Sequence, residues 1–278
     1  MRSVELHVGI MNRFILFLLL MVVFTSGCGR AHYNGQKVSD LLKQLDPASP
    51  ESDRAQAIGH LQRLGTNAFP FLIAEMNSFK WHTPQETNKS VIDRAQRLRA
   101  AFDVFGTNLI PLTNVFVESL NTNRNFVSAM DGLVAIGTRA VPYLLGALTN
   151  RESAIRLNAV AAILKLARTD SDTAMVALPH LIPLLKDESV LVRSLATETL
   201  GLYCANPSAC MPALLEIVLG DSDEVVRSQA VKAVGRIQAR VGRIDPNTRS
   251  VLEKVSRQDT SQVVRRNAER LLAQRNGN

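Results

Sequence analysis

The sequence predicts an all-α protein built as an α-solenoid, a stack of about six or seven helical hairpins. The 278 residues are 46% hydrophobic but only 5% aromatic, and the Leu, Val, Ala and Ile that remain suit the seams between packed helices. Two short patterns also recur along the chain, one built around Gly and Pro and the other around Arg. Recurrence at roughly 30 to 40 residues is typical of stacked helical hairpins.

The first segment is predicted to be a secretory signal over residues 1–27. Asn12 and Arg13 precede an apolar run over residues 14–24, and small residues follow up to Cys28. A basic flank, a short apolar run and small residues are the parts of such a signal. The run is shorter than the roughly 20 apolar residues that span a bilayer. We expect Met11 to be the true start of the protein.

The end of this segment, Ser26-Gly27-Cys28, resembles the lipobox of bacterial lipoproteins. The resemblance implies that Cys28 is acylated and becomes the mature N-terminus, so residues 28–35 form a lipidated tether before a solenoid over residues 36–278. Thr25 stands where that family usually has Leu, which leaves simple secretion as the alternative. Gly29 replaces the Asp that retains some lipoproteins at the inner membrane, so the resemblance implies an outer-membrane anchor facing the periplasm.

The first helix of each hairpin is predicted from a Gly-Thr-x-x-x-Pro pattern. It begins at Gly65, Gly106 and Gly137, and the repeated prolines Pro70, Pro111, Pro142, Pro179 and Pro212 stand 41, 31, 37 and 33 residues apart. Gly can end a helix in the left-handed conformation. Thr then begins the next helix, and Pro is tolerated in its first turn.

The second helix is predicted from a polar turn that leads to an Arg. The turn at Asp187 leads to Arg193, the turn at Asp221 leads to Arg227, and small and aliphatic residues follow at helical spacing. Arg156 and Arg265 hold the same place.

Together these patterns resemble those of the HEAT-repeat family, in the short style of the phycobilisome-lyase-like repeats. The resemblance covers about residues 36 to 273 and implies a right-handed stack. It also implies a ladder of hydrogen bonds between neighbouring repeats, made by turn Asp and helix Arg residues; its members here are Asp187, Arg193, Asp221, Arg227, Arg156, Asp259 and Arg265. The repeat of Arg156 has Asn150 in place of the turn Asp.

No pattern of catalytic or metal-binding residues appears in the sequence. The five histidines are scattered, and no nucleophile, phosphate-binding or dinucleotide-binding motif occurs. We therefore expect no enzyme activity, no metal and no cofactor. Cys204 and Cys210 flank a turn-rich segment, and the spacing leaves two alternatives: a disulfide, or two reduced core residues.

The basic charge is concentrated near the C-terminus. Residues 227–278 hold 12 Lys/Arg and 4 Asp/Glu, whereas the whole chain carries a net charge of only +7. The candidate residues for contact with an anionic partner are Arg236, Arg240, Arg243, Arg257, Arg266 and Arg270. They form either a solvated helix surface or an electrostatic dock for lipid headgroups or an acidic partner.

The predicted function is that of an envelope lipoprotein which binds a protein or peptide partner on its solenoid surface. The alternative is a nucleic-acid-binding protein, because some HEAT-like proteins, including certain alkylated-base DNA glycosylases, hold DNA in a basic groove. The export signal disfavours this alternative, since genomic DNA is not in the periplasm, and we expect no nucleic-acid partner.

Overall fold

The computed structural model describes residues 32–33, 36–78, 88–121, 125–204, 206–242 and 244–273. The predicted signal, Met11 and Cys28 lie outside these residues. The described chain is helical apart from two short antiparallel strands, β1 (His32–Tyr33) and β2 (Gln36–Lys37), in which His32 pairs with Lys37. The predicted all-α class is confirmed.

The chain divides into two compact units, and the first comprises residues 1–111 and 122–135. It holds two hairpins and the second helix of a third. Its helices are α2 (Val38–Gln44), α3 (Glu51–Leu64), α4 (Phe69–Asn77), α5 (Asn88–Phe105) and α7 (Phe126–Ile136), whose last residue falls in the second unit.

The second unit comprises residues 112–121 and 136–278. Its helices are α6 (Thr113–Ser119), α8 (Val141–Ala147), α9 (Ser153–Ala167), α10 (Ser171–Leu181), α11 (Val190–Tyr203), α12 (Pro207–Gly220), α13 (Glu224–Val241), α14 (Pro246–Gln258) and α15 (Gln262–Ala273). With the hairpins of the first unit, these make seven consecutive helix pairs among the described residues, in agreement with the predicted six or seven.

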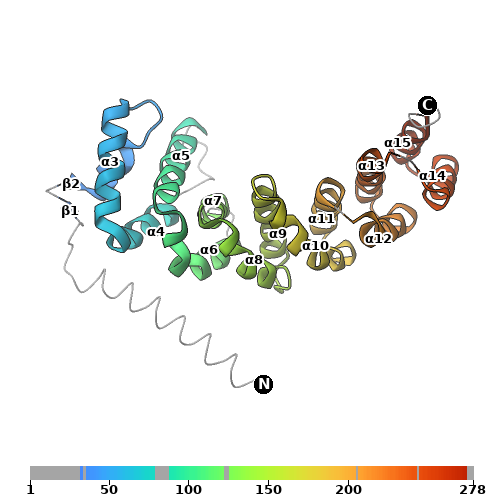
Figure 1. The fold of residues 1–278 in the computed structure, drawn as a ribbon, viewed down its shortest axis with the longest axis horizontal. Coiled ribbons are helices and arrows are strands. Elements are labelled where there is room, and N and C mark those ends of the chain that lie inside the picture. The colour runs from blue at the N-terminus through green and yellow to red at the C-terminus, as the bar shows by residue number, and fades with distance from the viewer. Residues whose placement is uncertain are drawn as a thin grey trace, which may run out of the picture. The chain divides into compact units, whose positions relative to one another are not determined.

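Within the second unit the helices form two rows (Figure 1). The first helices of the hairpins, α8, α10, α12 and α14, make one row. The second helices, α9, α11, α13 and α15, make the other, and each packs against the next along the row. Each hairpin thus buries its apolar residues both between its own two helices and against its neighbours, which is the packing of a solenoid.

The Gly-Thr-x-x-x-Pro pattern forms a turn that differs in part from the prediction. Gly65, Gly106 and Gly137 have φ of 54°, 49° and 74°, in the region that favours glycine. However, the next residues form short 3-10 turns, η1 (Gly65–Ala68), η2 (Gly106–Leu112) and η3 (Gly137–Ala140), rather than the predicted Thr-led helix start. Pro70 and Pro142 then lie in the first turn of α4 and α8, as predicted.

Three of the five repeated prolines do not lie in the first turn of an α-helix, and that part of the prediction is wrong. Pro111 lies inside η2, before α6 begins. Pro179 and Pro212 lie inside α10 and α12, which begin about two turns and one turn earlier. The carboxylate of Asp170 caps α10 by accepting hydrogen bonds from the N–H groups of Asp172 and Thr173, and Pro207 occupies the first turn of α12. These stronger start signals override the proline spacing.

One described segment, Ile92–Ser119, is long and apolar enough to cross a membrane by composition alone. In the structure it is not one helix. The positive φ of Gly106 ends α5, and η2 separates α5 from α6.

Two second helices approach each other closely at Gly201 of α11. A Cβ atom at this position would lie 2.6 Å from both Cα and Cβ of Ala233 in α13. That distance is well inside van der Waals contact, and one of the atoms is backbone, so the helices must move apart to admit a methyl group.

We therefore expect Gly201→Ala to lower the free energy of unfolding by about 2 kcal/mol, the usual cost of overpacking a core. Urea denaturation followed by circular dichroism measures the effect. The matched control is Gly220→Ala at the end of α12, where nothing lies within 4 Å of the added methyl. Equal stability of the two variants would contradict the close contact between α11 and α13.

Candidate functional site: the face of the second helices

The second helices are joined by bidentate ion pairs between Arg and Asp. Each ladder Arg is the fourth residue of its helix, and Nε and Nη2 of Arg156, Arg193 and Arg227 donate to both carboxylate oxygens of the Asp in the next turn of the stack. The nitrogen–oxygen distances are 2.7 and 2.8 Å for Arg156 with Asp187, 2.8 and 2.9 Å for Arg193 with Asp221, and 2.8 and 2.9 Å for Arg227 with Asp259.

The same groups also fix the turns between helices. Nη1 of Arg193 donates to the carbonyl oxygens of Asp187 and Glu188 in its own hairpin, and Arg227 does the same with Asp221 and Ser222. The Oδ1 atom of each Asp accepts a hydrogen bond from the N–H two residues later. Each guanidinium therefore joins two successive hairpins, and each pair is nearly buried: the Arg193 and Asp221 side chains are 11% and 4% exposed.

The two ends of the ladder show which bonds each residue type supplies. Asn150, in place of the turn Asp, still offers its carbonyl oxygen to Nη1 of Arg156, and its side chain accepts from the N–H of Glu152. At the other end Arg265 donates to the carbonyls of Asp259 and Thr260. Asn can therefore replace Asp in these two bonds of the turn.

Electrostatics in the ladder favours the charged forms. Burial raises the pKa of Asp187 and of Asp259, but the hydrogen bonds from the partner Arg and from the backbone outweigh it, and both carboxyls have a net pKa below their usual range. The hydrogen bonds that the guanidiniums of Arg156, Arg193 and Arg227 donate to Asp carboxylates raise the pKa of these three arginines. Ladder residues thus have their hydrogen-bonding capacity filled by the fold itself.

The first unit uses different contacts. Arg94 donates from Nε and Nη2 to one oxygen of Glu75, and Arg54 donates to the carbonyl oxygen of Pro47. Within the described part of this unit, no bidentate rung of the kind seen in the second unit occurs.

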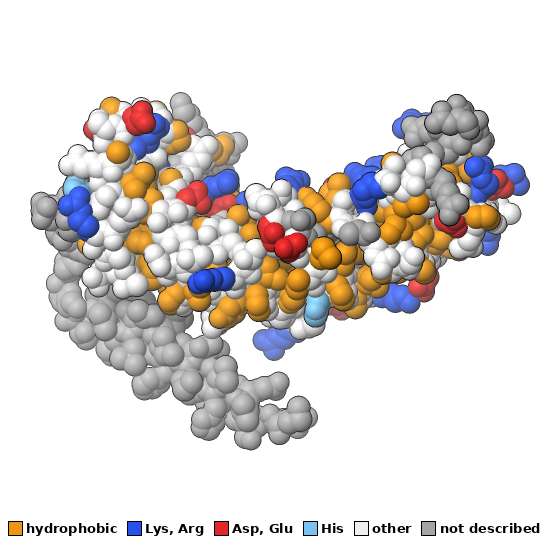
Figure 2. Space-filling model, in the orientation of Figure 1, with side chains coloured by type: hydrophobic (Ala, Val, Ile, Leu, Met, Phe, Trp, Pro, Cys, Tyr) orange, Lys and Arg blue, Asp and Glu red, His pale blue; other side chains and the backbone are white. Residues whose placement is uncertain are grey.

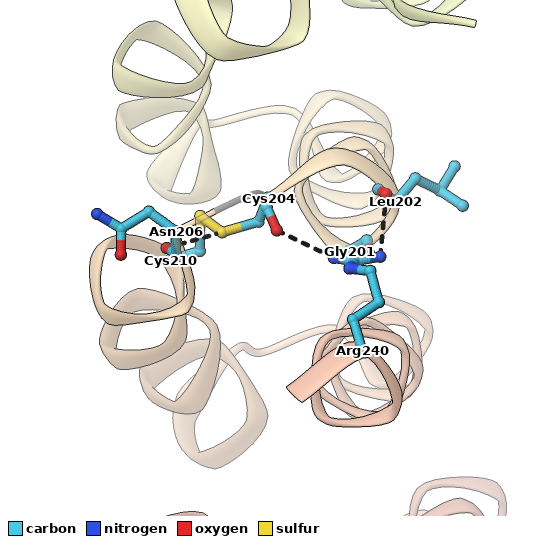
Figure 3. The surroundings of a disulfide bond; sticks show 6 residues. All are labelled: Gly201, Leu202, Cys204, Asn206, Cys210 and Arg240. Carbon is cyan, nitrogen blue, oxygen red and sulfur yellow. Dashed lines mark hydrogen bonds between the residues drawn. A yellow bond between two sulfur atoms is a disulfide. The ribbon is translucent and has the colours of Figure 1, made fainter. Parts of the chain in front are cut away.

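Cys204 and Cys210 form a disulfide between the end of α11 and the first turn of α12 (Figure 3). Their Cα atoms are 6.5 Å apart, and both residues are buried. The sequence left this pairing open because a Cα separation cannot be derived from spacing.

Arg240 of α13 lies beside the disulfide and caps α11 (Figure 3). Its Nη1 donates to the carbonyl oxygens of Gly201 and Leu202 at 3.1 and 3.0 Å, and its Nη2 donates to that of Cys204 at 3.1 Å. Burial and the nearby Arg236 lower the pKa of Arg240 from its ordinary value. Because these carbonyls end a helix, a cation is favoured there.

The six arginines expected to contact an anionic partner do not form one surface. The guanidinium of Arg240 is occupied by α11, and Arg243 lies outside the described residues. Arg257 is exposed on α14, in the row of first helices. Arg236, Arg266 and Arg270 remain together on the second helices α13 and α15.

Lys232 of α13 is a further cation of the second helices, and the charge pattern of the sequence does not single it out. It lies five residues after Arg227, just as Arg270 lies five residues after Arg265, so alignment of the repeats on the ladder arginine would have found it. We call Lys232, Arg236, Arg266 and Arg270 the basic face. No ion pair joins any of them to a carboxylate in the described part of the chain.

Exposed aliphatic side chains lie on the same helices. Leu191, Val225 and Val263 each stand two residues before the ladder arginine of α11, α13 and α15 and are 64%, 55% and 56% exposed. We call these three residues the aliphatic row. Among the described residues, no group of three or more His, Cys, Asp and Glu side chains is arranged to hold a metal ion.

Comparison with known proteins agrees with this repeat architecture. A family model described as HEAT repeats matches residues 178–273, which contain the ladder from Asp187 to Arg265. No curated protein matches the chain. The chain thus has a HEAT-like repeat scaffold fold.

Several solved structures are similar to the chain at low identity. An engineered protein is 18% identical, with a TM-score of 0.43 over 85% of this chain and 95% of that one. Human deoxyhypusine hydroxylase in complex with glycerol is 17% identical, with a TM-score of 0.38 over 87% and 96%. An archaeal HEAT-like repeats protein from Thermococcus onnurineus is 13% identical, with a TM-score of 0.39 over 85% and 96%.

The ladder predicts a large effect for the loss of one arginine. Arg193→Ala leaves the buried Asp221 carboxylate and two turn carbonyls without their donor, so we expect the free energy of unfolding to fall by about 3 kcal/mol. Thermal denaturation tests this. The matched control is Arg151→Ala, whose side chain is 93% exposed in its pair with Glu152 and should cost about 0.5 kcal/mol or less. If Arg193→Ala has the same melting temperature as the wild type, the ladder does not stabilise the packing of the hairpins.

Proposed function

We propose that this protein is a non-enzymatic scaffold that binds a protein or peptide partner on the face of its second helices. The aliphatic row carries this proposal. Three large side chains at the same position of three successive helices remain more than half exposed, although the ladder holds those helices rigidly. Exposed aliphatic side chains that recur in register suit a partner lying across several repeats.

The absence of enzyme activity belongs to the same proposal. The carboxylates of the ladder are saturated by Arg and backbone donors, which suits a structural role better than proton transfer. Human deoxyhypusine hydroxylase is an enzyme with a similar fold, so the proposal depends on this chain's own side chains rather than on its fold.

The proposed location is the bacterial envelope, with the chain lipid-anchored through Cys28 at the outer membrane and facing the periplasm. The basic flank, apolar run and Ser26-Gly27-Cys28 ending support export. The Cys204–Cys210 disulfide also supports it, because disulfides persist in oxidising compartments such as the periplasm.

Location is tested by expressing the chain in a bacterium. We expect the wild type to begin at a lipidated Cys28, to fractionate with membranes and to have Cys204 and Cys210 protected from alkylation. Cys28→Ser should lose the lipid mass and the membrane association, and a variant without residues 1–27 should have reduced thiols. Unchanged mass and fractionation of Cys28→Ser would exclude the lipid anchor.

Partner binding is tested in the same cells by site-specific photocross-linking. A photoreactive side chain at Leu191 or Val225 should give a discrete adduct with another protein. The control position is Lys254, which is exposed on α14 in the row of first helices. Adducts at Lys254 but not at the two row positions would contradict a binding face on the second helices.

A further inference from the structure

We infer that the basic face and the neighbouring aliphatic row together bind an acidic segment of a partner protein that also carries aliphatic side chains. This inference rests on the proposed scaffold function and specifies the chemistry of the partner. It is carried by the second helices α13 and α15, which lie within one unit of the structure.

The two helices that carry the basic face, α13 and α15, are in direct contact. A Cβ at Gly235 would lie 3.2 Å from Cδ1 of Leu271, and Nδ2 of Asn267 donates to Oγ of Ser228 at 2.9 Å. Lys232 and Arg236 are one turn apart on α13, and Arg266 and Arg270 are one turn apart on α15. The basic face therefore comprises two cations on each of two packed helices.

The charges of this face are not neutralised by the fold. Each described guanidinium of the ladder is paired or bound to turn carbonyls, whereas no ion pair within the described chain involves Lys232, Arg236, Arg266 or Arg270. Nη1 of Arg236 is moreover buried and has no hydrogen-bond partner among the described residues. Lys232, Arg266 and Arg270 are exposed, and like charges on neighbouring helices repel, so a bound carboxylate would relieve that repulsion.

The aliphatic row continues the same surface toward the start of each helix. Val225 precedes Lys232 by seven residues, and Val263 precedes Arg270 by seven, so each pair lies on one side of its helix about 10 Å apart. Figure 2 shows hydrophobic and basic side chains next to one another on the surface of the C-terminal hairpins. A ligand that covers this area needs carboxylates and aliphatic groups side by side.

This arrangement favours a protein segment over a membrane or a nucleic acid. In a bilayer the aliphatic region lies deeper than the anionic headgroups, whereas here both kinds of side chain share one face. Nucleic acid offers phosphates but no aliphatic counterpart for Val225 and Val263.

The experiment measures binding of a fluorescent peptide composed of glutamate and leucine to the full chain in detergent. The matched peptide has glutamine in place of glutamate. The test variant is Lys232→Glu with Arg266→Glu, and the control variant is Lys254→Glu with Arg257→Glu, which changes the net charge equally on exposed residues of α14. Circular dichroism and thermal denaturation confirm that both variants fold.

We expect the glutamate peptide to bind the wild type and to weaken as salt rises, and the glutamine peptide to bind at least about tenfold more weakly. The basic-face variant should lose at least about tenfold in affinity for the glutamate peptide, and the α14 variant about twofold or less. Val225→Gln with Val263→Gln should also weaken binding, since the row supplies part of the contact.

Three outcomes overturn the inference: equal loss in the two charge variants, no preference for glutamate over glutamine, or binding of anionic vesicles or single-stranded DNA in place of the peptide. Photocross-linking distinguishes a wrong inference about the partner's chemistry from a wrong proposal about the scaffold function. If the adduct at Leu191 persists in the basic-face variant, the scaffold stands and its partner is not held by charge.

Discussion

The bidentate bond between an Arg on one second helix and an Asp in the next turn is the interaction on which the second unit depends. Solenoid repeats meet only their neighbours, so their orientation must be fixed at each seam. Aliphatic packing fixes how closely the helices approach, but it is non-directional, whereas hydrogen bonds depend on the orientation of both groups. The planar guanidinium of Arg193, held by two carboxylate oxygens and two turn carbonyls, permits one arrangement.

The ladder also decides which charged residues remain available to a partner. It uses Arg156, Arg193 and Arg227 in the interior of the stack, and Arg240 is used at the end of α11. The basic face consists of cations on α13 and α15 that none of these contacts employs. A high count of Arg near the C-terminus therefore overstates the charge that a partner meets, and the position of each Arg on its helix is what matters.

The second helices were more predictable from sequence than the first. The ladder Arg is the fourth residue of each of the second helices α9, α11, α13 and α15, because the contact between repeats requires it there. The first helices carry no residue of the ladder, so their start can vary. Pro179 and Pro212 kept the repeat spacing, yet α10 and α12 begin earlier, where Asp170 and Pro207 give local start signals.

The sequence by itself determined the helical class, the hairpin repeat and the identity of the ladder residues, because periodicity, turn chemistry and a recurring Arg are local properties of the chain. Only the tertiary structure decided which Asp each Arg binds, that Cys204 and Cys210 are joined, and that Arg240 caps α11 whereas Lys232 belongs to the basic face. These outcomes depend on distances between residues about 30 positions apart or between neighbouring helices, and such distances are set by packing rather than by spacing along the chain.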